Sequence, residues 1–86
     1  MADGEKNRVT VDIYGKTYTI RGDAPTEWIT QVAAYVDQKM RDIAGRHLYL
    51  DTAKIAVLAA LNLADEYFRL KQEHETLLQM LDEEGK

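Results

Sequence analysis

The chain has 86 residues, of which 45% are hydrophobic and 30% charged, and its formal net charge at pH 7 is −4. With one proline and five glycines, this composition is that of a small globular domain and excludes collagen-like, proline-rich and wholly disordered chains. The absence of cysteine excludes disulfides and thiol catalysis, and no apolar run approaches the roughly 20 residues that span a bilayer.

The N-terminal part of the chain has the pattern of a β-hairpin. Residues 1–7 are small, charged and aperiodic, and we expect them to form a disordered lead-in. From residue 8 to residue 20, hydrophobic and polar side chains alternate on either side of Gly15-Lys16. This alternation predicts two antiparallel strands joined by a two-residue turn at Gly15-Lys16, where glycine tolerates a positive φ.

An amphipathic helix is expected to follow the hairpin. Pro25 suits the first turn of a helix, and Gly45 is a plausible C-terminal stop. Between them, apolar residues recur in steps of three and four, which is the period of a helix with one buried face. A second apolar strip lies beside this stripe and consists of Trp28, Val32 and Tyr35.

The rest of the chain has the pattern of one long helix. Asp51 or Thr52 can cap it, and no glycine or proline occurs between Thr52 and Glu84, which allows about 33 helical residues. Residues 55–64 are apolar except for Asn62, which predicts a segment enclosed on all sides. Farther on, one stripe stays apolar and predicts a heptad seam: Leu63, Tyr67, Leu70, His74, Leu77 and Leu81.

These elements predict an α+β protein with a head and a stalk. The head, residues 8–64, consists of the β-hairpin, the first helix and the front of the long C-terminal helix. Residues 65–86 form the stalk. A single stalk would expose its leucine stripe, so we expect a coiled-coil homodimer, with a dimer of dimers as an open alternative.

Three segments of the chain resemble the bacterial cell-division protein ZapA family. They are the hairpin over residues 9–20, the helix segment over 32–40 and the run over 54–66, in which Ala-Ala-Leu-Asn-Leu-Ala is the most specific element. The resemblance implies a cytoplasmic, non-enzymatic protein at the division site, in the short compact form of the family. It would bind FtsZ, the tubulin-like division protein, and cross-link or bundle its protofilaments to promote Z-ring assembly during septation. A generic coiled-coil adaptor with another protein partner is the alternative.

Residue types that carry chemistry are sparse. The two histidines stand 27 positions apart without a third soft ligand, so we expect no metal site, and His74 reads as a polar position of the seam. No nucleophile–base set and no phosphate-binding loop occur, so we expect neither catalysis nor a cofactor. We expect the amide of Asn62 to be structural, bonded to the hairpin or to the link over residues 46–50, with a partner contact as the alternative.

The distribution of charge favours the head as the partner-binding part. Residues 8–50 carry a balance of +1 and residues 51–86 a balance of −4, which disfavours nucleic acid as a partner. Generic solubility is the plain alternative for any single basic side chain. Among them the resemblance favours Lys16 and Arg46, which match basic positions of the family at the turn and after the first helix. The full set of candidate FtsZ contacts is Lys16, Arg21, Lys39, Arg41 and Arg46.

Overall fold

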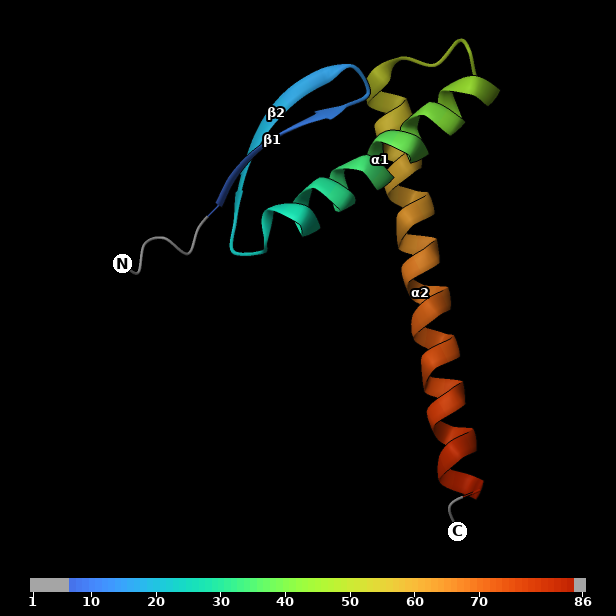
Figure 1. Cartoon of the computed structure of the whole chain (residues 1–86). Helices are drawn as coiled ribbons and strands as arrows, with labels where there is room; N and C mark the ends of the chain where they lie inside the picture. Colours follow the sequence, from blue (N-terminus) through green and yellow to red (C-terminus); the bar gives the residue numbers. More distant parts are fainter. Residues whose placement is uncertain (1–6, 85–86) are drawn as a thin grey trace.

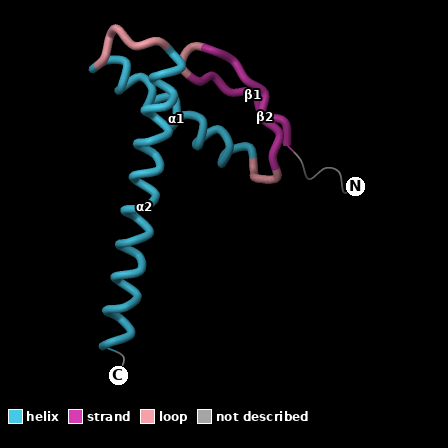
Figure 2. Tube along the Cα trace, turned by 180° about the vertical axis from the view of Figure 1, so that it is seen from behind, coloured by secondary structure: helices cyan, strands magenta, loops and turns pink. Residues whose placement is uncertain are grey.

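The computed structural model describes residues 7–84 as an antiparallel hairpin followed by two helices (Figure 1). The strands are β1 (Asn7–Ile13) and β2 (Lys16–Gly22), and the helices are α1 (Thr26–Arg46) and α2 (Thr52–Glu84). The hairpin lies along α1, and α2 crosses α1 and then extends away from the head, as both views show (Figures 1 and 2). The predicted α+β order of elements is therefore confirmed.

The hairpin has the expected kind of turn, displaced by one residue. Ile13 pairs with Lys16, so the two turn residues are Tyr14 and Gly15, with φ of +50° and +82°. The prediction of a turn at Gly15-Lys16 was wrong because Lys16 is already the first residue of β2. Two consecutive positive φ values match the turn class whose twist suits paired strands, and the second position takes the glycine. The lead-in expected over residues 1–7 lies outside the described residues, apart from Asn7, which begins β1.

Two small apolar clusters hold the head together. In the first, Val9 and Val11 of β1 pack against Ile29 and Ala33 of α1. In the second, α1 meets α2 through Met40, Ile43, Ile55 and Ala59. The apolar stripe predicted for α1 therefore packs against the hairpin near the N-terminal end of the helix and against α2 near its C-terminal end.

The connection between the helices depends on one side-chain cap. Asp51 Oδ1 accepts a hydrogen bond of 2.9 Å from the backbone N–H of Lys54, which satisfies one of the free donors at the start of α2. The other end of the link differs from expectation. The helix continues through Gly45 and ends at Arg46, with His47 as the C-cap, so the stop predicted at Gly45 was one residue early.

The front of α2 is covered on one side only. Ile55 is 2% exposed against the head, whereas Val57 is 58% and Leu61 is 61% exposed on other faces of the helix. The prediction of a segment enclosed on all sides therefore fails for a single chain, because the head packs only against the face of α2 that carries Ile55 and Ala59. No helix within residues 7–84 is long and apolar enough to cross a membrane.

Candidate protein-interaction site

Lys16 lies beside a hollow where the hairpin and both helices meet. The hollow has a volume of about 420 Å³, and its lining includes Tyr14, Tyr18, Met40 and Thr52 beside Lys16. Its wall is mostly apolar or aromatic, with one cationic side chain at the edge. Such a combination of apolar contact area and a charged anchor is typical of surfaces that bind proteins.

Arg21 and Arg46 also keep their charged groups available. Both residues are exposed, and neither side chain forms a hydrogen bond or an ion pair with another residue in the described range. Arg46 is the last residue of α1, where a cation interacts favourably with the negative end of the helix dipole. Of the five basic candidates, these two and Lys16 therefore present free cations at the surface of the head.

The other two basic candidates are held by carboxylates of the same chain. Lys39 forms an ion pair with Glu66 of α2. The Nε of Arg41 donates to both oxygens of Asp37, at 3.1 and 3.0 Å. A cation that already has a carboxylate partner must give it up to bind another one, so the structure separates these two from the free cations.

Asp37 also fixes the hairpin turn to α1, which the sequence pattern did not indicate. Its Oδ1 accepts a hydrogen bond of 2.7 Å from the backbone N–H of Tyr14. This bond and the Arg41 side chain hold the pKa of Asp37 below its ordinary value. The one signal in the sequence is an acidic residue directly after the half-buried stripe position Val36, and that signal is too common to identify a contact.

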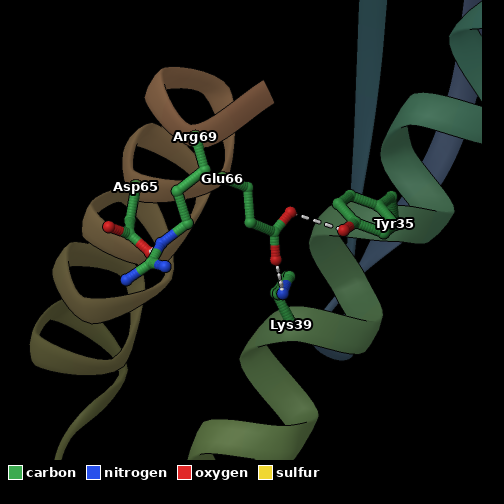
Figure 3. A network of polar contacts seen from close by, with 5 residues as sticks. All are labelled: Tyr35, Lys39, Asp65, Glu66 and Arg69. Atoms are coloured by element: carbon green, nitrogen blue, oxygen red, sulfur yellow. Dashed lines mark hydrogen bonds and ion pairs between the residues drawn. The ribbon is translucent and has the colours of Figure 1, made fainter. Parts of the chain in front are cut away.

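Glu66 joins the two helices through two bonds (Figure 3). The hydroxyl of Tyr35 donates to its Oε1 at 2.5 Å, and the ammonium of Lys39 pairs with its Oε2. The Lys39 ammonium also lies 5.4 Å from the centre of the Tyr35 ring, within the range of a cation–π contact. The bond from Lys39 and then that from Tyr35 lower the pKa of Glu66, while the pKa of Lys39 and that of Tyr35 are raised by the same carboxylate.

The predicted seam of α2 lies open along the stalk. Its first member, Leu63, is half-buried and borders a groove of about 500 Å³ lined by the second strip of α1, Trp28, Val32 and Tyr35. The members beyond it are exposed, with Leu70 at 65%. They are Tyr67, Leu70, His74, Leu77 and Leu81. The strip of α1 and the seam of α2 thus form one continuous apolar surface.

Asn62 is exposed, and its side chain forms no hydrogen bond with any residue from 7 to 84. The bond expected to the hairpin or to the link over 46–50 is therefore not made within residues 7–84, because Asn62 lies on an exposed face of α2. Its structural role stays a prediction. Among the described residues, no three side chains of His, Asp or Glu are grouped so that they could hold a metal ion.

Comparison with known proteins identifies the family. The chain matches the family described as "Cell division protein ZapA" over residues 9–84. It is 49% identical over 84 residues to the cell division protein ZapA of Geobacillus sp. (strain WCH70), covering 98% of this chain and 97% of that protein. The ZapA of Bacillus thuringiensis (strain Al Hakam) is 44% identical over 82 residues, covering 95% and 92% of the two chains. The chain belongs to the ZapA family.

Two solved structures have the same fold. One is a ZapA mutant dimer from Geobacillus stearothermophilus, with a TM-score of 0.71 and 44% identity over 90% of each chain. The other is described as an unknown conserved bacterial protein from Pseudomonas aeruginosa PAO1, with a TM-score of 0.63 and 31% identity over 90% of each chain. The resemblance of the hairpin and the Ala-Ala-Leu-Asn-Leu-Ala segment to ZapA is thereby confirmed. The chain is a non-enzymatic cell division protein of the ZapA family, which binds FtsZ and promotes Z-ring assembly.

Proposed function

We propose that two copies of this chain pair through α2 and cross-link FtsZ protofilaments with their two heads. The continuous apolar surface formed by the strip of α1 and the seam of α2 is the observation that carries this proposal. The dimer would present two heads whether its stalks pair in parallel or antiparallel, so one dimer could hold two filament subunits. Linking two binding sites raises the avidity without any new kind of contact.

The exposed seam supports a dimer. Leu70, Leu77 and Leu81 are each more than half exposed on the part of α2 beyond Glu66, where every described side chain is exposed. Burying a leucine stabilises a structure by about 1.5–3 kcal/mol, so a second copy would gain from each of them. A solved structure of a ZapA mutant dimer from Geobacillus stearothermophilus, 44% identical over 90% of each chain, supports the pairing of two copies. Residues 65–86 would then be the coiled-coil stalk and residues 8–64 the head.

The free cations of the head support FtsZ binding there. Lys16 borders the hollow between the β-hairpin, α1 and α2, and Arg46 ends α1. The residue balance of +1 over 8–50 against −4 over 51–86 favours the head for an acidic filament. Charges of this kind steer association and fix orientation, and salt screens them over about 8 Å at physiological ionic strength. The protein would then act in the cytoplasm at the division site.

Charge reversal on the head tests the site. The double variant Lys16→Glu with Arg46→Glu should keep its helix content and its dimer mass, because neither side chain lies on an apolar stripe. It should lose co-sedimentation with FtsZ polymer and the rise in light scattering that bundling produces. Arg69→Glu reverses an exposed cation on the stalk, which pairs with Asp65 of the same helix, and should leave both readouts unchanged.

The result also separates the alternative function. A coiled-coil adaptor for another protein would form the same dimer but would not sediment with FtsZ in either form. A double variant that still bundles filaments at the wild-type concentration would move the site away from Lys16 and Arg46.

A further inference from the structure

Glu66 lies where α2 leaves the head. The buried contacts between the helices end at Ala59, and Leu63 is the last apolar residue of α2 beside α1. Glu66 is one turn farther on and is the last residue of α2 with a side-chain bond to α1 in the described part of the chain. After it, every described side chain of α2 is exposed.

The bonds of Glu66 form a two-point clamp on that turn. Its two oxygens bind two side chains one turn apart on α1, Tyr35 at 2.5 Å and Lys39 through the ion pair. Two contacts that share one carboxylate resist rotation of α2 about its own axis, which a single contact would allow. The clamp is partly shielded from water, since the Lys39 and Glu66 side chains are 23% and 35% exposed. Charge-assisted bonds are stronger than neutral ones, and this shielding limits their screening.

We propose that Glu66 is a positioning residue that sets the direction of the stalk relative to the head, through Tyr35 and Lys39. This inference rests on the proposed cross-linking dimer, because a fixed head-to-stalk direction matters when two heads must hold two filaments at a defined spacing. Without the clamp, the apolar cluster around Ile55 and Ala59 still joins the helices. The stalk, however, can rock and rotate on that cluster.

The clamp competes with a pair between Glu66 and the partner copy. In the heptad defined by the seam, Glu66 takes a g position and Lys71 an e position, which attract each other across a parallel coiled coil. The structure commits Glu66 to its own head. Because Glu66 lies beside the seam and binds α1 of its own chain, it links the orientation of the seam to that of the head.

The distance between the two heads of the dimer tests the clamp. The chain contains no cysteine, so Thr30→Cys on the exposed side of α1 gives one spin label in each copy. Pulsed electron paramagnetic resonance then measures the distribution of label-to-label distances in the dimer. We expect one narrow distribution in the otherwise unchanged chain, and about twofold broadening with Glu66→Gln, which keeps the shape but removes the ion pair.

Asp65→Asn is the matched control. Asp65 is the neighbouring carboxylate, has an ion pair of 2.8 Å with Arg69 of the same helix, and lies away from α1 (Figure 3). The control should leave the distribution narrow, and the charge-swapped pair Lys39→Glu with Glu66→Lys should restore it. Equal widths for Glu66→Gln and Asp65→Asn, or no narrowing in the swapped pair, would overturn the proposal.

Binding to FtsZ is read separately from the clamp. Glu66→Gln should co-sediment with FtsZ polymer as the wild-type protein does, because Lys16 and Arg46 are unchanged, but its bundling should fall several-fold. A wild-type protein that fails to co-sediment would refute the proposed function and leave the distance measurement as a valid test of the clamp. Undiminished bundling by a dimer with a broadened distribution would overturn the role of Glu66 in cross-linking.

Discussion

The backbone N–H of Tyr14 donates to Asp37 Oδ1 at 2.7 Å, across 23 positions of the sequence. Tyr14 has a φ of +50°, a backbone conformation that residues other than glycine rarely adopt. The aspartate of α1 therefore holds the strained residue of the hairpin turn in place. It also fixes the tip of the hairpin, with Lys16 at its edge, to the first helix.

We expect this contact to make the head sensitive to acid. Because the pKa of Asp37 is lowered in the folded state, the unfolded chain binds a proton at a higher pH than the folded chain does. The contribution is fully present above the ordinary carboxyl pKa of 3.8 and is lost as the pH falls through the lower folded value. Urea unfolding between pH 6 and about pH 3 should show a smaller loss of stability for Asp37→Asn than for the wild type. If the free energy of unfolding fell equally with pH in the two proteins, the stabilising role of ionised Asp37 would be contradicted.

Two glycines with equally open surroundings should respond in opposite ways to alanine. A Cβ added at Gly15 or at Gly45 would have no atom within 4 Å, so packing does not distinguish them. Gly15 has a φ of +82°, and Gly15→Ala should destabilise the protein by about 1–2 kcal/mol. Gly45 lies inside α1, and Gly45→Ala should stabilise it by about 0.5–1 kcal/mol. Thermal unfolding at one fixed protein concentration measures both, and a shift of the same sign would be inconsistent with the turn described here.

A charge in the seam should separate the two copies. Leu70→Asp would bury a carboxylate among leucines, and the desolvation of an unpaired charge costs several kcal/mol. We expect a monomer by analytical ultracentrifugation at micromolar concentration. Gln72→Asp, at the outer heptad position on the same stretch of helix, should remain a dimer. A wild-type protein that sediments as a folded monomer would refute the seam itself.

Shortening the side chain of Ile55 should weaken the packing between α1 and α2. Among the described residues Ile55 is the most deeply buried large side chain, and Ile55→Ala should destabilise the protein by about 2–5 kcal/mol. Val57→Ala is the comparison two residues away, on a face that the head does not cover. If denaturant unfolding gave a larger loss for Val57→Ala, the partner copy rather than α1 would supply the main packing of this segment.

The sequence by itself determined the elements and their faces. Hydrophobic period and the placement of glycine and proline act over a few residues, so the hairpin, the stripe of α1 and the uninterrupted α2 were all predictable. The turn was misplaced by one residue because Tyr14 takes a positive φ that its residue type disfavours, and Asp37 stabilises that choice from a distant helix.

Only the tertiary structure decided which charges are free. Lys16 and Lys39 are the same residue type. Lys16 is exposed at the surface, whereas Lys39 binds Glu66, which lies 27 positions later in the sequence. Such long-range pairs depend on how the two helices cross, and the spacing of hydrophobic residues within one helix does not specify that crossing. The same holds for the front of α2, whose apolar residues predict burial on all sides. Within residues 7–84, the head covers the side of α2 with Ile55 and Ala59 and leaves Val57 and Leu61 exposed.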